Sequence, residues 1–104
     1  FRAAHPEAEA AARATLLRTD PAGYVACCHA VAKVDWREAL PTLACPVLVI
    51  AGARDQGAPV AMSEAIVQAR PGAKLVVLEN ASHISVMEEP RAFEQTIREF
   101  LGSL

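Results

Sequence analysis

Aromatic residues and basic charge are both scarce in this sequence of 104 residues. Phe, Trp and Tyr make up 5% of the chain, so any core must be built from Val, Leu, Ile and Ala. The formal net charge is −2, which leaves no basic field to attract nucleic acid or an anionic membrane surface. The sequence also lacks a run of about 18 apolar residues and a cationic start followed by an apolar stretch. We therefore expect no membrane span and no secretory signal.

Cysteine is scarce as well, with only Cys27, Cys28 and Cys45. An odd number that includes an adjacent pair is a poor disulfide framework, and the spacing matches no zinc-binding pattern. We therefore expect free, buried thiols, no metal ligands and a reducing, cytoplasmic environment.

The sequence has no initiator methionine and begins Phe1-Arg2-Ala3-Ala4-His5. This start favours a fragment or a processed chain. Its 104 residues are enough for one small domain with a single core.

The first third of the chain favours helices. Residues 7–18 are rich in Ala, Leu, Glu and Arg, which are strong helix formers. Asp20 and Pro21 then suit the N-cap and the first position of a second helix over about 22–32. A short helical turn is expected around residues 36–40.

The pattern changes to strands after Pro46. Val47 to Ala51 is an unbroken apolar run that ends at Gly52, which is typical of a strand buried on both faces. Residues 74–78 (KLVVL) predict a second buried strand. Both runs are apolar on both faces, so we expect neighbouring strands that this sequence does not contain. A missing N-terminal part or another chain would have to cover them.

Helices are expected after each of these strands. Apolar residues recur at helical spacing at Met62, Ala65, Ile66 and Ala69, and again at Phe93, Ile97, Phe100 and Leu101. Pro90 suits the start of the last helix, and residues 79–88 are expected to form a loop. The order strand, helix, strand, helix predicts an α/β fold with parallel strands joined by a right-handed crossover.

Titratable residues follow both predicted strands. Ligands of open parallel sheets bind beyond the carboxyl ends of the strands, where Asp55 follows the first strand and His83 the second. A carboxylate beside an imidazole fixes the histidine tautomer and stabilises its protonated form. Each residue alone also has a simpler interpretation, because Asp55 could only cap a turn and His83 could be an ordinary loop histidine.

A nucleophile is harder to find. None of the serines lies in a Gly-x-Ser-x-Gly turn; they are Ser63, Ser82, Ser85 and Ser103. Cys28 and His29 are adjacent on a predicted helix, where their side chains point about 100° apart. We interpret Glu88 and Glu89 as the charged start of the last helix. The sequence thus predicts an acid and a base without a nucleophile.

Two segments resemble the α/β-hydrolase family. Residues 46–55 (PVLVIAGARD), followed by Ala58-Pro59, resemble its acid-bearing strand and loop. Residues 72–83 (GAKLVVLENASH), followed by Glu88-Glu89-Pro90, resemble its histidine-bearing strand, loop and final helix. The family order is serine, acid, histidine. The resemblance therefore implies catalytic roles for Asp55 and His83 and a serine upstream of Phe1.

The helical part carries a narrower resemblance. Residues 20–31 (DPAGYVACCHAV) and 35–38 (DWRE) are similar to the end of the cap in 3-oxoadipate enol-lactonases, hydrolases of the β-ketoadipate pathway of bacterial aromatic degradation. This implies the end of a cap over residues 1–40 and the C-terminal part of the hydrolase core over residues 41–104. The loop over 55–59 (DQGAP) departs from the group, which often has Thr or Ser before the proline.

The resemblance implies hydrolysis of a small-molecule lactone or ester by a Ser-His-Asp mechanism without cofactor or metal. The substrate carboxylate would need a cationic partner, for which Arg54 is one candidate. Two alternatives stay open: another esterase or carbon–carbon hydrolase of this fold, and a non-catalytic interaction module that buries its open strands against a partner chain.

Overall fold

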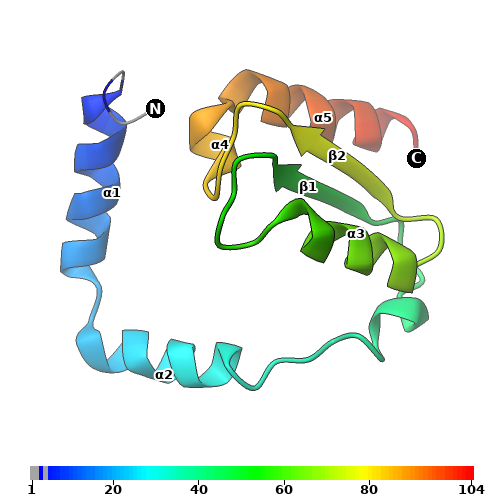
Figure 1. Cartoon of the computed structure of the whole chain (residues 1–104), viewed down its shortest axis with the longest axis horizontal. Helices are drawn as coiled ribbons and strands as arrows, with labels where there is room; N and C mark the ends of the chain where they lie inside the picture. Colours follow the sequence, from blue (N-terminus) through cyan, green and yellow to red (C-terminus); the bar gives the residue numbers. More distant parts are fainter. Residues whose placement is uncertain (1–2, 4) are drawn as a thin grey trace. The chain divides into compact units, whose positions relative to one another are not determined.

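The structure is a computed structural model that describes residue 3 and residues 5–104. The chain separates into two compact units, of which one ends at Asp35 and the other spans Trp36–Leu104 (Figure 1). No helix in the described part of the chain is both long and apolar enough to cross a membrane.

The first unit consists of two helices, α1 (Pro6–Arg18) and α2 (Pro21–Val31), which agree with the predicted ranges to within one residue. Asp20 caps α2 as predicted, because its carboxylate accepts a hydrogen bond from the Gly23 N–H at 2.7 Å. Neither helix has a buried residue, so the apolar side chains of α2, Tyr24 among them, stay exposed within this unit.

The second unit contains the predicted alternation of strands and helices. Its elements are η1 (Leu40–Thr42), β1 (Leu48–Gly52), α3 (Val60–Ala69), β2 (Lys74–Leu78), α4 (Ser85–Glu88) and α5 (Pro90–Gly102). The two strands pair in parallel, with Leu48 opposite Lys74 and Gly52 opposite Leu78. Helix α3 contacts both strands and α5 contacts β2, and Figure 1 shows the strands lying between these two helices. The unit is therefore a partial α/β fold.

Two local predictions need correction. The helical turn expected around residues 36–40 continues into η1, because proline fits the first turn of a helix. Residues 79–88 are not entirely loop, since α4 occupies Ser85–Glu88 and the N–H groups of Met87 and Glu88 both donate to the Ile84 carbonyl. A four-residue helix is too short to produce a periodic apolar pattern.

The core of the described chain is smaller than the sequence predicts. The buried hydrophobic residues of the described chain are Ala51, Leu78 and Ala81, all at or just beyond the carboxyl ends of the strands. Apart from Gly52, which is also buried, the rest of each strand is half-buried or exposed, so the prediction of strands buried on both faces is not met within this chain. The buried residues of the second unit thus lie at the edge of the sheet from which the loops with Asp55 and His83 leave.

The cysteines and the last helix also differ from expectation. Cys27, Cys28 and Cys45 are free, as predicted, but all of them are exposed, because α2 has no buried face and Cys45 precedes β1 in an open segment.

In α5, Leu101 is exposed, whereas the apolar positions Phe93, Ile97 and Phe100 are half-buried. Lys74 holds this helix to the start of β2, with its Nζ 3.0 Å from Ser103 Oγ and 5.7 Å from the centroid of the Phe100 ring.

Candidate active site

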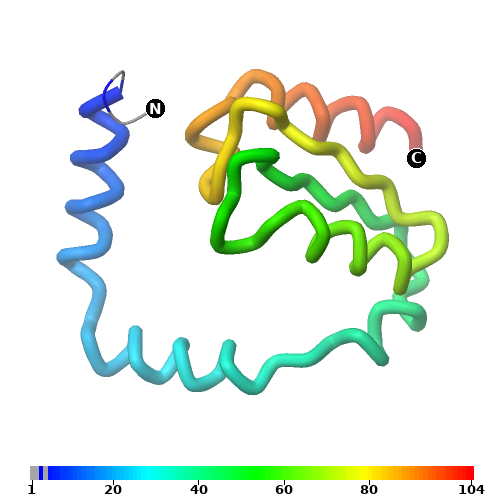
Figure 2. The backbone as a smooth tube through the Cα atoms, in the orientation of Figure 1, coloured from blue at the N-terminus to red at the C-terminus, as the bar shows by residue number. Residues whose placement is uncertain are grey.

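The loops that follow β1 and β2 are joined through their backbones. The Ala53 N–H donates to the Leu78 carbonyl at 3.0 Å, and the Arg54 N–H donates to the Ala81 carbonyl at 2.9 Å. Figure 2 shows both loops leaving the same end of the strands. These bonds continue the contact between the strands into the segments that carry Asp55 and His83.

Gly52 makes this close approach possible. A Cβ atom at this position would lie 2.7 Å from the Ala81 carbonyl oxygen and would clash with the Ser82 carbonyl oxygen. Real Cβ atoms essentially never come so near to backbone atoms. The glycine that ends β1 is therefore a spatial requirement for bringing the two loops together.

Asp55 and His83 lie within hydrogen-bonding distance, with 2.8 Å between Oδ2 of the carboxylate and Nδ1 of the imidazole. A carboxylate can only accept, so the tautomer that satisfies this bond carries the proton on Nδ1. Nε2 then keeps its lone pair. The Asp55 side chain is 9% exposed and the His83 side chain 72%, so the carboxylate lies beneath a histidine that is open to solvent.

The second carboxylate oxygen of Asp55 has a different role. Oδ1 accepts hydrogen bonds from the Gly57 N–H at 2.8 Å and from the Ala58 N–H at 3.0 Å. Asp55 thus caps the turn through one oxygen, and its other oxygen faces His83. The Gly-Ala pair before Pro59, which departs from the enol-lactonase pattern, supplies these two donors through its backbone.

These contacts hold the pKa of Asp55 below its ordinary value. The largest cause is the hydrogen bond from the Ala58 N–H, followed by the hydrogen bond from His83, with smaller contributions from the Gly57 N–H and the charge of His83. Desolvation acts in the opposite direction without cancelling them. Asp55 therefore stays ionised and can stabilise positive charge on the imidazole.

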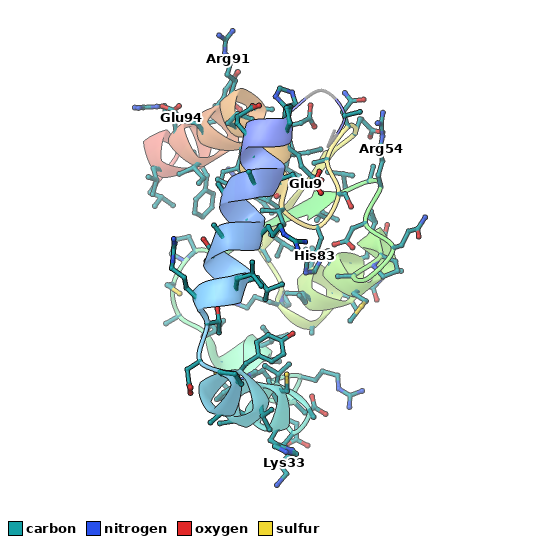
Figure 3. The ribbon with its side chains drawn as sticks, turned by 90° about the vertical axis from the view of Figure 1, so that its left-hand side faces the viewer. Glu9, Lys33, Arg54, His83, Arg91 and Glu94 are labelled. Carbon is teal, nitrogen blue, oxygen red and sulfur yellow. The ribbon has the colours of Figure 1, made fainter. Side chains whose placement is uncertain are left out.

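Arg54 extends the connection between the two loops. Its Nη2 donates to Oδ1 of Asn80 at 2.6 Å. Arg54 follows β1 and Asn80 follows β2, so this bond crosses between the segments that carry the acid and the histidine; Figure 3 labels Arg54 and His83. The Arg54 guanidinium, a candidate for binding the substrate carboxylate, is thus already hydrogen-bonded to Asn80.

Other residues considered in the sequence lie on α2 and at the end of α5. Cys28 and His29 are consecutive residues of α2, which belongs to the first unit. Ser103 Oγ accepts from Lys74 and donates to the Phe100 carbonyl at the end of α5. Among residue 3 and residues 5–104, no group of three or more His, Cys, Asp or Glu side chains could hold a metal ion.

Sequence reasoning missed the role of Glu88 and Glu89. Glu88 Oε2 accepts a hydrogen bond from the Ser82 N–H at 2.6 Å, and Glu89 Oε2 accepts one from the Asn80 N–H at 3.2 Å. Glu89 occupies the N-cap position of α5, yet its side chain makes no capping hydrogen bond there. The pair does stand at the start of α5, as interpreted, but that interpretation is incomplete, since both carboxylates also bind the histidine loop. No periodic signal in the sequence reveals such a contact.

Comparisons with known proteins agree with this geometry. The sequence profile of the alpha/beta hydrolase family matches residues 2–96. Two curated relatives from Acinetobacter baylyi are 3-oxoadipate enol-lactonase 2, 44% identical over 75 residues, and 3-oxoadipate enol-lactonase 1, 34% identical over 90 residues. These alignments cover 72% and 86% of this chain.

A solved structure shows the same similarity in three dimensions. The enol-lactonase from Burkholderia xenovorans matches 97% of this chain with a TM-score of 0.93 and 37% sequence identity. The chain spans 28% and 34% of the length of the two curated relatives and 38% of that crystallised chain. The acid and the histidine at neighbouring strand ends and the family match over residues 2–96 lead to one conclusion. The chain belongs to the α/β-hydrolase family.

Proposed function

We propose that this chain supplies the acid, Asp55, and the general base, His83, of a hydrolase of the 3-oxoadipate enol-lactonase type. The observation that carries the proposal is the distance of 2.8 Å between Asp55 Oδ2 and His83 Nδ1 at the carboxyl ends of neighbouring parallel strands. This is the arrangement that the orienting half of a Ser-His-Asp triad requires.

The proposed reaction is ester hydrolysis in two steps. In the first, a serine hydroxyl attacks the lactone carbonyl while His83 Nε2 accepts its proton. The bond between the carbonyl carbon and the ring oxygen then breaks, and the ring opens on an acyl-enzyme. His83 gives the proton it holds to the departing ring oxygen and becomes a base again. In the second step, His83 takes a proton from water as the water attacks the acyl carbon, and it then returns a proton to the serine oxygen when the bond between that oxygen and the acyl carbon breaks. Asp55 stabilises the imidazolium in both steps, and neither step requires a metal or an organic cofactor.

The names of the relatives support a substrate class. Two curated relatives and one solved structure carry the name enol-lactonase, so we propose a small-molecule enol-lactone as the substrate and aromatic degradation through the β-ketoadipate pathway as the setting. The exposed ring of His83 supports this proposal, since its Nε2 must reach an external substrate.

We further propose that the nucleophile lies outside residues 1–104. The chain contains no Gly-x-Ser-x-Gly turn and spans about a third of the length of the curated relatives. The half-buried faces of β1 and β2 are then the surfaces that the preceding part of the hydrolase core would cover. A Gly-x-Ser-x-Gly turn encoded about a hundred residues upstream is expected in the complete protein.

An assay of two purified proteins tests this proposal. One is the chain of residues 1–104, and the other is the complete protein encoded around it; both are sized and then assayed with 3-oxoadipate enol-lactone. The proposal predicts turnover by the complete protein and none by the chain alone. Turnover by the isolated chain would show that it holds its own nucleophile. Inactivity of the complete protein towards the lactone and simple esters would favour an interaction module.

A further inference from the structure

The loop that carries His83 has little regular structure of its own. Between the end of β2 at Leu78 and the start of α4 at Ser85, the Ala81 N–H bonds back to the Leu78 carbonyl. The next two contacts come from farther along the chain, where the Asn80 and Ser82 N–H groups are bound by carboxylates. The conformation of this loop thus depends on side chains that lie outside it.

The peptide groups around Ser82 are held from two sides. On one side, the carbonyls of Ala81 and Ser82 lie against Gly52, and the Ala81 carbonyl also accepts the Arg54 N–H. On the other, the Ser82 N–H donates to Glu88 Oε2 at 2.6 Å. A hydrogen bond of this length to an ionised acceptor is shorter and stronger than one between neutral groups.

The position of the His83 ring depends on how the Ser82 peptide is held. Its side chain is 72% exposed, and its bond in the site is the one to Asp55. Little packing therefore restrains the ring, so the backbone immediately before it must set where the ring can lie. Ser82 is that backbone, and Glu88 is the side chain that binds its N–H.

We propose that Glu88 is a positioning residue, which holds the Ser82 peptide and thereby keeps the His83 imidazole in register with Asp55. This inference deepens the proposed function and rests on it for its kinetic consequence. Glu88 touches neither the substrate nor the reacting atoms. Its contribution is that His83 is already oriented towards Asp55 when the substrate arrives.

Glu89 provides the contrast within the same structure. It also accepts a backbone N–H of the loop, but the bond is longer, at 3.2 Å, and its donor, Asn80, lies three residues before His83. Asn80 is additionally tied to Arg54 through its side chain. Loss of the Glu89 carboxylate should therefore disturb the start of the loop and leave the Ser82 peptide in place.

The test compares Glu88→Ala, Glu88→Gln and Glu89→Gln in the complete hydrolase. Glu88→Ala should lower kcat roughly 10- to 100-fold with KM within about twofold, because catalytic geometry is lost and substrate binding is not. Glu88→Gln keeps an acceptor oxygen and should restore most of kcat. Glu89→Gln should stay within about threefold of the parent protein in both parameters.

Nuclear magnetic resonance gives a readout that does not require turnover. In Glu88→Ala, the Ser82 amide proton should move upfield and the His83 Nδ1 proton should broaden or disappear, because the imidazole no longer keeps its bond to Asp55. In Glu88→Gln, the Ser82 amide should shift partway, since a neutral acceptor binds more weakly. In Glu89→Gln, the Asn80 amide should shift while Ser82 does not. Should Glu88→Ala fail to fold, Glu88→Gln still tests the contact, because an unshifted Ser82 amide in that variant would refute it.

The outcomes separate this inference from the proposed function. If the complete hydrolase lacks lactonase activity, but Glu88→Ala shifts the Ser82 amide and loosens the His83 proton while Glu88→Gln shifts Ser82 partway, the function falls and the positioning role stands. If Asp55→Asn abolishes turnover but both Glu88 variants keep the parent kcat and the parent resonances, the positioning role is refuted and the function stands. If Glu89→Gln lost as much kcat as Glu88→Ala, the specific role of Glu88 would also be overturned.

Discussion

The backbone of Gly52 lies directly against the backbone of Ser82, at a distance that leaves no room for a Cβ atom. Gly52 ends the strand before the acid, and Ser82 immediately precedes the histidine. This one contact therefore sets how closely the two loops can approach, and the bond between Asp55 and His83 depends on it.

Substitution of Gly52 by alanine should separate the loops. The atoms in the way belong to the backbone and cannot rotate aside, so we expect Gly52→Ala to reduce the free energy of unfolding by about 1–3 kcal/mol, which urea denaturation measures. Gly102→Ala is the matched control, since nothing lies within 4 Å of its Cβ position at the end of α5. That change should be neutral or stabilise by up to about 1 kcal/mol. Equal stabilities of the two variants would contradict the steric account.

Substitution of Asp55 by asparagine should disable His83 through its tautomer. The single amide oxygen would remain with the N–H donors of Gly57 and Ala58, so the amide NH₂ would face His83. Nδ1 must then accept, which moves the imidazole proton to Nε2, where the lone pair is needed. We expect kcat of the complete hydrolase to fall about 10⁴-fold. A fall of less than about tenfold would show that Asp55 is only a turn residue.

The lowered pKa of Asp55 predicts a pH dependence of stability. The folded state binds fewer protons than the unfolded state, so the stabilisation is fully present above the unfolded pKa and is lost as the pH falls through the folded pKa. The difference in unfolding free energy between the parent chain and Asp55→Asn should shrink as the pH falls below about 4. Urea titrations of both proteins on either side of that pH measure it. A difference that grows as the pH falls below about 4 has the wrong sign for this account.

The bond between Arg54 and Asn80 should couple the two loops energetically. A double-mutant cycle of Arg54→Ala and Asn80→Ala, read by urea unfolding, should give a coupling energy of about 0.5–1 kcal/mol, because the pair is exposed. The single variant Arg54→Lys cannot reproduce the planar guanidinium geometry and should lose most of this coupling. Strict additivity of the two alanine variants would mean that the contact does not join the loops.

Much of the second unit can be predicted from its sequence because its signals are local. Residues 74–78 form a strand with the predicted bounds, and Pro90 begins α5 where its fixed φ suits the first turn. The proximity of Asp55 and His83 follows from one topological rule, that parallel strands end at the same edge. These inferences need only a short window of sequence and a known sheet geometry.

What the sequence does not reveal depends on contacts between distant segments. The roles of Glu88 and Glu89 arise from backbone donors six and nine residues away, and a helix start explains the same charges equally well. Burial is also poorly predicted, since the cysteines and Leu101 have apolar surroundings in the sequence but no covering element in the described chain. Composition indicates which residues can be buried, whereas packing partners decide which ones are.

The most direct test of the central claim is the lactonase rate of the complete hydrolase after substitution of His83 by alanine. His5→Ala is the control of matched residue type, because His5 lies next to α1 and bonds to Glu7. If His83 is the general base held by Asp55, His83→Ala lowers kcat by several orders of magnitude with an unchanged folded structure, and His5→Ala stays near the parent rate. A loss of only a few-fold in His83→Ala would contradict the assignment of His83 as the base.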